Sequence, residues 1–168
     1  GANKLPKDYE VKSTVIKPAK VLIAAEQSIL DKTNSIRVES VDVKGAKTNV
    51  IKTVKLIPDK GVELPDVQEV EVIVNIGEIE DEKKITVPTI ALRNMKENRK
   101  AVLSVSEAQV RVKAVRSILH QLTAENIILY VDAAGLDKGT YELPIQWSAP
   151  DGVEVLSVDP VKIAVTIG

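Results

Sequence analysis

The amino-acid sequence contains its own repeat, and this constrains the fold more than any other feature. Residues 61–77 align without gaps on 152–168, and about half of the paired residues are identical. Three further matches follow in the same order upstream, at spacings of 89 or 90 residues against 91 for the first: 19–23 with 108–112, 28–30 with 117–119, and 41–45 with 131–135. Such an ordered series indicates that one structural unit has been duplicated. We therefore predict two tandem domains, residues 1–83 and 84–168.

A charged stretch, Glu78–Lys84, separates the two copies. We interpret it as a solvated joint, followed by a new strand that begins at Ile85. Its four acidic residues also raise the possibility of a cation site. Calcium loops space their oxygen ligands around a turn-forming glycine, which is missing here, so the linker interpretation is preferred.

The apolar residues predict a β-rich fold. Val and Ile dominate them, Phe is absent, and the only aromatic residues are one Trp and three Tyr. β-Branched side chains suit a strand better than a helical turn. Strict alternation predicts strands at Val161–Ile167 and Tyr141–Trp147, with Tyr141 and Trp147 packed in the core. Ile127–Val131 is apolar on both faces, which predicts a central strand.

Proline and short helical patterns complete the expected fold. Pro144 has no amide hydrogen to donate, so its strand is expected at a sheet edge or at a bulge. Each copy has one short helical pattern, at Ser28–Lys32 and at Ser117–Leu122, and the first resembles a capping box between Ser28 and Asp31. The predicted fold class is all-β with one short helix per repeat.

Several glycine and aspartate residues that could suggest a functional site are explained by predicted turns. The candidate turn glycines are Gly45, Gly61, Gly135, Gly139 and Gly152. Asp42 and Asp132 occupy equivalent positions in the two copies and invite an interpretation as paired functional carboxylates. Each precedes a glycine-containing turn, where Asp commonly accepts bonds from nearby backbone amides, so the structural role is preferred.

The composition gives no indication of catalysis. The chain has no Cys and one histidine, His120, which is expected to be solvated, so a nucleophile–histidine pair is improbable. We expect no cofactor, no metal ion and no small-molecule substrate. The 23 basic and 24 acidic residues are scattered, which argues against nucleic acid as a partner.

A contact with another protein is the remaining class of function. The small basic segment from Arg93 to Lys100, which includes Met95, Lys96 and Arg99, is the first candidate for a partner surface. Exposed strand edges are a second candidate, for which we predict the closing strands Val70–Ile76 and Val161–Ile167.

The ordered landmarks resemble the YbbR repeat family over nearly the whole chain. The resemblance at the front of a repeat is carried by Pro6, 9–11, 15–21 and 28–30, and at the back by 131–132, 135–136, 139–141, 150–153 and 159–161. Copy one departs from the pattern, because it lacks counterparts of Gly139 and Pro160. The resemblance implies two tandem β modules.

The resemblance also implies a function and a location. Proteins of this family are typically anchored by an N-terminal membrane helix and carry their repeats outside the cytoplasm. In many Gram-positive bacteria they are associated with regulation of the membrane-bound diadenylate cyclase that makes cyclic di-AMP, so this cyclase is the expected partner. The sequence begins at Leu5-Pro6 as if within a domain, so the membrane is expected to be reached only through a segment outside this chain. The alternative is a structural spacer or adhesive cell-surface β repeat.

Overall fold

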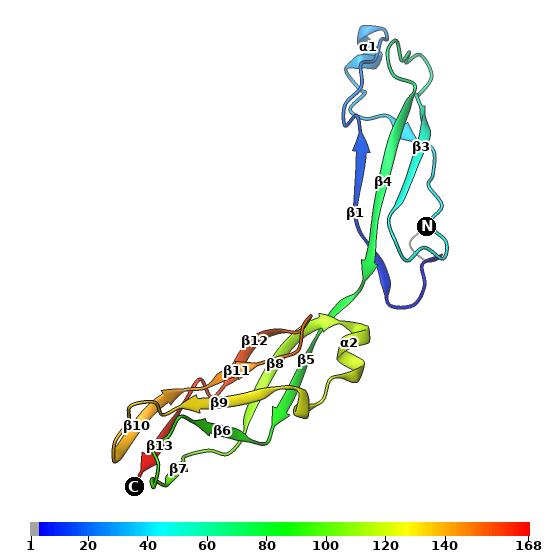
Figure 1. Ribbon diagram of the computed structural model, residues 1–168. Coiled ribbons are helices and arrows are strands. Elements are labelled where there is room, and N and C mark those ends of the chain that lie inside the picture. Colours follow the sequence, from blue (N-terminus) through cyan, green and yellow to red (C-terminus); the bar gives the residue numbers. More distant parts are fainter. Residues whose placement is uncertain (1–3) are drawn as a thin grey trace. The chain divides into compact units, whose positions relative to one another are not determined.

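The computed structural model describes residues 4–168, which form two compact units that divide between Ile79 and Glu80 (Figure 1). Strands dominate both units, and each unit has a hydrophobic core of its own. The predicted all-β fold with one short α-helix per copy is confirmed. The division lies slightly earlier in the chain than the predicted boundary between residues 83 and 84.

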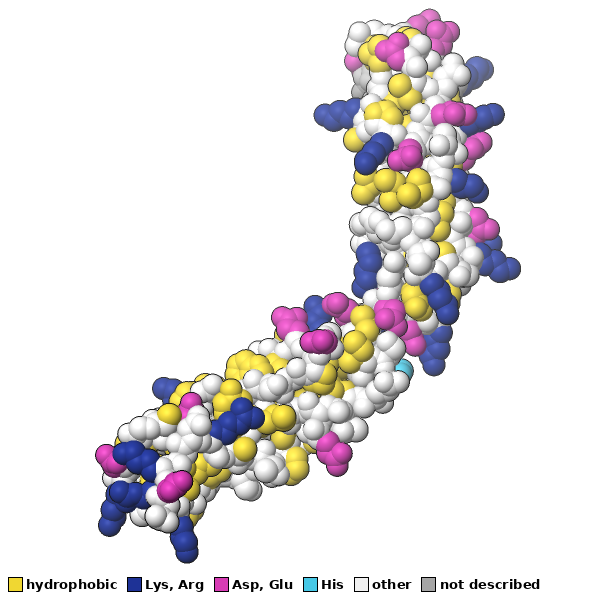
Figure 2. All heavy atoms as spheres, viewed as in Figure 1, with side chains coloured by type: hydrophobic (Ala, Val, Ile, Leu, Met, Phe, Trp, Pro, Cys, Tyr) yellow, Lys and Arg dark blue, Asp and Glu magenta, His cyan; other side chains and the backbone are white. Residues whose placement is uncertain are grey.

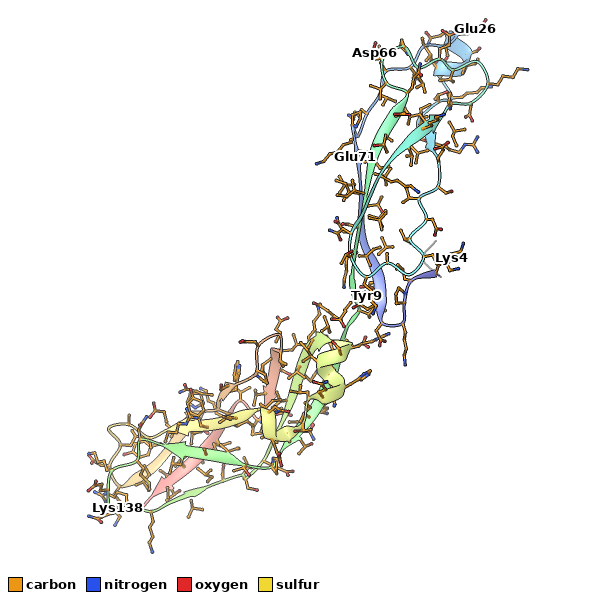
Figure 3. The ribbon with its side chains drawn as sticks, turned by 45° about the vertical axis from the view of Figure 1, so that its right-hand side comes forward. Lys4, Tyr9, Glu26, Asp66, Glu71 and Lys138 are labelled. Atoms are coloured by element: carbon orange, nitrogen blue, oxygen red, sulfur yellow. The ribbon has the colours of Figure 1, made fainter. Side chains whose placement is uncertain are left out.

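Unit 1 is built on one antiparallel sheet with the strand order β1-β4-β3-β2. Its elements are β1 (Tyr9–Lys17), α1 (Gln27–Leu30), β2 (Arg37–Val38), β3 (Val50–Ile57) and β4 (Glu69–Glu78). Tyr9, at the start of β1, and Glu26, which precedes α1, lie at opposite ends of the unit (Figure 3). Strand β4 pairs with β1 on one side and with β3 on the other.

The core of unit 1 rests on one face of β4. Val70, Val72, Val74 and Ile76 alternate along the strand and are all buried, as the period of two requires. Between them, Ile73 faces away from this core and aligns with Val15 on β1 and Ile51 on β3. The Ile51 side chain is 63% exposed, so this opposite face of the sheet carries apolar residues in contact with solvent.

Unit 2 contains three three-stranded sheets, ordered β12-β8-β5, β10-β13-β7 and β11-β9-β6. Its first elements are β5 (Glu80–Val87), β6 (Ile90–Arg93), β7 (Ala101–Leu103), β8 (Ala108–Val115), α2 (Arg116–Gln121) and the 3-10 helix η2 (Ala124–Asn126). Its last strands are β9 (Ile128–Asp132), β10 (Gly139–Pro144), β11 (Gln146–Ser148), β12 (Glu154–Asp159) and β13 (Lys162–Ile167). Only β6 and β9 pair in parallel.

The core of unit 2 gathers the inward residues of its central strands. Val110 and Val112 on β8, Val131 on β9 and Val165 on β13 are fully enclosed. Strand β9 is central in its sheet, as predicted. Its burial on both faces was also expected, but Ile128 is 46% exposed, because one face of this sheet meets solvent.

The predicted joint at Glu78–Lys84 is wrong for most of its length, because Glu80 already begins β5. Strand β5 pairs with β8 from Glu80↔Val115 to Val87↔Ala108. Its exposed acidic residues form ion pairs with basic residues of and after β8: Glu80 with Lys113, Asp81 with Arg116, and Glu82 with Arg111. The charges that suggested a linker are therefore the solvent-facing part of an edge strand.

The predicted single strand Tyr141–Trp147 is also wrong, because the chain changes sheets after Pro144. Strand β10 pairs with β13, whereas β11 pairs with β9. Between them, the buried Ile145 donates its amide hydrogen to the carbonyl of Val161 at 2.9 Å. Trp147 is 48% exposed, so its predicted core position is wrong. Pro144 does end a strand at a sheet edge, as predicted.

Both helices begin one residue earlier than their sequence patterns, at Gln27 and at Arg116. The predicted capping box in copy one is wrong, because α1 begins after Glu26 and no side chain caps it. Asp31 instead accepts a hydrogen bond from the Gln27 side chain at 2.7 Å. A reciprocal cap does form in unit 2, between Thr123 and Asn126 at η2.

Candidate interaction surface

Asp42 and Asp132 hold the same turn in the two units. The Asp42 carboxylate accepts a hydrogen bond from the Lys44 amide at 3.0 Å, and the Asp132 carboxylate accepts one from the Ala134 amide at 2.9 Å. The bond from the Lys44 amide is the main reason why the pKa of Asp42 lies below its ordinary value. Both aspartates thus make the contact with the backbone amide two residues later that is typical of their turn.

In unit 2 this turn is also joined to the loop after β6. The Asn94 side chain donates to the Asp132 carboxylate at 3.1 Å. This bond and, second, the one from the Ala134 amide lower the pKa of Asp132. Asp132 therefore connects two loops rather than facing an open site.

The basic segment from Arg93 to Lys100, which begins at the last residue of β6, makes several contacts within unit 2. The Arg93 guanidinium stacks on the Tyr130 ring, 3.8 Å from its centroid. Lys96 forms an ion pair with Asp137, which is the main cause of the lowered pKa of that carboxyl. Met95 packs partly against the core. Figure 2 shows charges of both signs spread over the visible face, so no single-sign patch is present on that face.

The candidate turn glycines all have positive φ, with values of 72° for Gly45, 86° for Gly61, 74° for Gly135, 151° for Gly139 and 82° for Gly152. At two equivalent positions there is also a close contact. A Cβ on Gly61 would lie 2.6 Å from Cδ1 of Ile29, and a Cβ on Gly152 would lie 2.7 Å from Cδ1 of Ile118. In both copies a turn thus packs tightly onto the short helix.

The two closing strands are not exposed edges, which corrects the prediction for a partner strand. β4 lies between β1 and β3, and β13 lies between β10 and β7. Their flanking partners come from distant parts of the chain, so the sequence pattern of the closing strands does not reveal them. In unit 2 the outer strands are instead β5, β12, β10, β7, β11 and β6.

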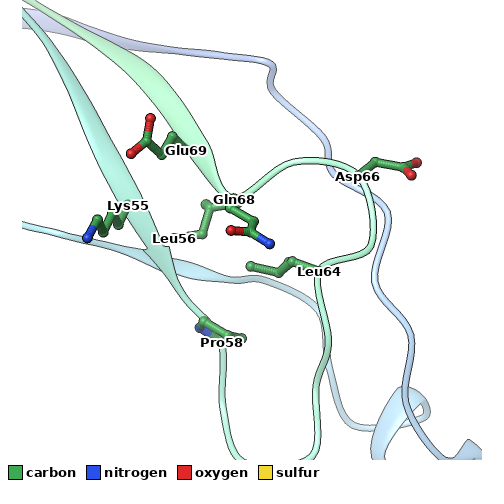
Figure 4. A pocket seen from close by; sticks show the side chains of 7 residues that line it. All are labelled: Lys55, Leu56, Pro58, Leu64, Asp66, Gln68 and Glu69. Atoms are coloured by element: carbon green, nitrogen blue, oxygen red, sulfur yellow. The ribbon is translucent and has the colours of Figure 1, made fainter.

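Unit 1 contains a cavity at the end of its sheet, beside β3 and β4. It has a volume of about 670 Å³ and is lined by Lys55, Leu56, Pro58, Leu64, Asp66, Gln68 and Glu69 (Figure 4). A second cavity of about 400 Å³ lies beside the segment 18–23. Both are open at the surface and mix polar with apolar side chains.

The remaining search for chemistry covers residues 4–168 only. Within this part of the chain, no three His, Cys, Asp or Glu side chains gather in a group able to hold a metal ion. His120 is exposed on α2. No helix in the same range is both long and apolar enough to cross a membrane.

The geometry defines a tandem pair of small β modules whose charged side chains serve turns, ladders and loop contacts. The YbbR-like protein family matches residues 1–76 and 90–167, one segment in each copy. The chain therefore belongs to the YbbR-like family. No curated protein matches the chain.

Solved structures of YbbR-like proteins resemble part of the chain. A YbbR-like domain from Listeria monocytogenes has 22% identity and a TM-score of 0.46, over 52% of this chain and 92% of that one. A YbbR family protein from Desulfitobacterium hafniense DCB-2 has 12% identity and a TM-score of 0.45, over 51% and 94%. A YbbR-like protein from Streptococcus pneumoniae TIGR4 has 21% identity and a TM-score of 0.44, over 54% and 48%.

Proposed function

We propose that this chain is a non-catalytic, extracytoplasmic repeat region of a membrane-anchored protein, which regulates a membrane-bound diadenylate cyclase by protein contact. The observation that carries this proposal is the family match in both copies, together with the cyclase association that the family resemblance implies. The charged side chains that first suggested function contact other parts of the same unit, because Asp132, Lys96 and Arg93 each contact a neighbouring loop or strand. This supports a binding role over a catalytic one.

Attachment to the membrane is central to this function for a physical reason. A weak contact between an ectodomain and its partner is scarcely occupied in dilute solution. When both proteins share one membrane, the effective concentration can reach roughly millimolar, and the same contact is then occupied. The two units released from the membrane should therefore have little effect on a cyclase.

The test is to express the two units beside a candidate cyclase in cells, once with a membrane anchor and once without. The anchored form is expected to change the level of cyclic di-AMP, and the soluble form is expected to leave it unchanged. Equal effects from both forms, or turnover of a nucleotide by the purified chain, would contradict the proposal.

A matched replacement separates regulation from simple spacing. In the anchored protein, the two units are exchanged for two unrelated β modules of similar size. Regulation through a specific surface is expected to disappear in this chimera. If the chimera still changes the cyclic di-AMP level to the same extent, the units act as a spacer and the regulatory proposal is wrong.

A further inference from the structure

Strand β1 leaves one long edge of unit 1 unpaired. It is the end strand of the sheet β1-β4-β3-β2, and within residues 4–168 no strand lies on its other side (Figure 1). Its residues from Lys12 to Lys17 are all exposed. An exposed edge of this kind offers its backbone groups to a further strand.

The other copy of the module has the same free edge. In unit 2, β7 holds the place of β1, because Val102↔Thr166 corresponds to Ser13↔Asn75 in the repeat. β7 is likewise an end strand, and the strands β5 and β6 that precede it pair with β8 and β9 instead. The free edge is therefore a property of the module. It is longer in unit 1, where β1 spans nine residues, than in unit 2, where β7 spans three.

The direction of the backbone groups shows which residues of β1 form the edge. The Ile79 amide donates to the Asp8 carbonyl at 2.7 Å, so Ile79 directs its backbone groups toward β1. Successive residues of a strand direct these groups to opposite sides, so every second residue of β4 does the same. Their partners on β1 turn their own groups to β4. The alternate residues have theirs at the free edge, and these are Val11, Thr14 and Ile16.

Natural sheets often protect an edge with a bulge or a lysine, and β1 has both at Lys12. The Lys12 side chain, however, lies over β4. Its Cε would be 3.2 Å from a Cβ on Gly77, and its ammonium forms an ion pair with Glu10 at 2.9 Å. Lys12 is thus directed over the sheet and leaves the backbone groups of the edge uncovered.

Two copies of β1 match each other in one antiparallel register. A two-fold axis perpendicular to the sheet at Thr14 places Val11 opposite Ile16 of the second copy. The same axis places Glu10 opposite Lys17 of the second copy. Each pair occurs twice, so the ladder has two apolar pairs flanked by two pairs of opposite charge, which is a favourable set of cross-strand neighbours. Moving the axis by one residue in either direction separates both charge pairs.

The bulge is what makes these pairs lie on one face of the sheet. It inserts Lys12 into β1 and so shifts the alternation of side chains by one residue. As a result, Val11 and Ile16 both belong to the core face, where they align with the buried Ile76 and Val72. Without the inserted residue the two side chains would lie on opposite faces and could not meet across the axis.

We propose that unit 1 pairs with unit 1 of a second copy of this chain through β1, antiparallel and about a two-fold axis at Thr14. The two four-stranded sheets then form one continuous sheet, with both cores on the same side. A weak contact of this kind is occupied when both copies share one membrane, where the effective concentration can reach roughly millimolar. The pairing does not involve the cyclase, so either proposal can fail without the other.

Cysteine cross-linking tests the register, because the chain has no cysteine of its own. Directly opposed residues of antiparallel strands have Cβ atoms about 4.5–5.5 Å apart, close to the reach of a disulfide. Glu10→Cys and Lys17→Cys are made separately in the full chain. Under mild oxidation each variant alone should stay monomeric, and an equal mixture of the two should form a covalent dimer. Thr14→Cys should form a dimer alone, and the matched control Thr53→Cys, at an exposed threonine of β3, should not.

Charge reversal tests the complementarity without a covalent bond. Analytical ultracentrifugation measures the dissociation constant of the dimer. Glu10→Lys puts like charges together at both ends of the ladder and should weaken self-association about tenfold. The double variant Glu10→Lys with Lys17→Glu restores opposite charges and should recover most of this loss. Both sites are exposed, so the circular dichroism spectrum should be unchanged in each variant.

Three results would overturn the proposal. The first is the absence of a covalent dimer in the mixture of Glu10→Cys with Lys17→Cys. The second is cross-linking of Thr53→Cys to the same extent, which would reflect random collision. The third is a chain that stays monomeric at roughly millimolar concentration, which would show that the bulge and Lys12 protect the edge.

Discussion

Cδ1 of Ile118 lies 2.7 Å from the position that a Cβ on Gly152 would occupy, and Ile29 stands in the same relation to Gly61 at 2.6 Å. Each short helix therefore packs against a turn at its glycine, the residue that has no side chain, and the two copies share this contact. Gly152 also has a φ of 82°, a conformation that residues with a side chain adopt at a cost.

We expect Gly152→Ala to lower the free energy of unfolding of unit 2 by more than the roughly 1 kcal/mol of backbone strain. Gly135→Ala is the matched control, because Gly135 has a similar φ of 74° but nothing within 4 Å of its added Cβ. Chemical denaturation measures both variants. Adding Ile118→Val, which removes Cδ1, should recover part of the loss in Gly152→Ala. Equal destabilisation by the two glycine variants would show that the close approach of the added Cβ to Ile118 does not lower the stability of unit 2.

The start of unit 2 can be tested by truncation. A fragment that begins at Glu80 retains all of β5 and should fold cooperatively, with a melting temperature near that of unit 2 in the whole chain. A fragment that begins at Ile85 loses three ion pairs and five of the eight residue pairs of the β5–β8 ladder, so it should melt at a clearly lower temperature. Circular dichroism measures both. Identical melting curves would restore the interpretation of Glu80–Lys84 as a linker.

Lys83 is expected to stabilise the end of α2. Its ammonium donates to the carbonyls of Leu119 and Leu122, both at 3.2 Å, and cations are favourable at the C-terminal end of a helix. Lys83→Met keeps the aliphatic stem and should cost about 1 kcal/mol of unfolding free energy. Lys84→Met is the control, since Lys84 lies on the outward face of the same strand. Similar effects of both variants would argue against a specific role for the two bonds.

Acid should weaken the turn at Asp132. The Asn94 side chain and then the Ala134 amide lower the pKa of Asp132 below its ordinary value of 3.8. The folded state thus binds fewer protons than the unfolded state, and the contribution to stability is present above about pH 4 and is lost as pH falls through the lowered pKa. Asp132→Asn should flatten the pH dependence of the unfolding free energy below pH 4.

Asn94→Ala provides an independent check on the acid effect, because it keeps the carboxylate and removes the largest cause of the lowered pKa. The pH dependence should flatten in this variant as well. An unchanged slope in both variants, measured by denaturation at several pH values, would contradict the assigned cause.

The features of this fold that can be predicted from the sequence are those set by neighbouring residues along the chain. The alternation at Val161–Ile167 and the edge position of Pro144 follow from side-chain periodicity and from a missing amide hydrogen, both of which are properties of single residues. The central positions of β4 and β13 could not be predicted, because their partners β1 and β7 lie far away in the chain. Trp147 was misplaced for a similar reason, since its alternation with Ile145 continues across a change of sheet.

The candidate surface was harder to predict than the fold. The basic residues Arg93 and Lys96 appeared available in sequence, but their partners, the Tyr130 ring on β9 and the Asp137 carboxylate after β9, lie far away in the chain. The segment 19–26 matches β8 in its apolar pattern, yet its one β-pairing within residues 4–168 is the bridge between Ala24 and Glu63, and no local signal in the sequence marks this difference.

The single residue Ile79 between β4 and β5 has a mechanical consequence. Tension along the chain reaches unit 1 through β4, which is bonded to neighbours on both sides, and reaches unit 2 through β5, which is bonded on one side only. The ladder between β5 and β8 is thus the weaker of these two attachments under load. A pull along the chain is therefore expected to strip β5 from β8, and so to bare one edge of β8, before it separates β4 from its two neighbours.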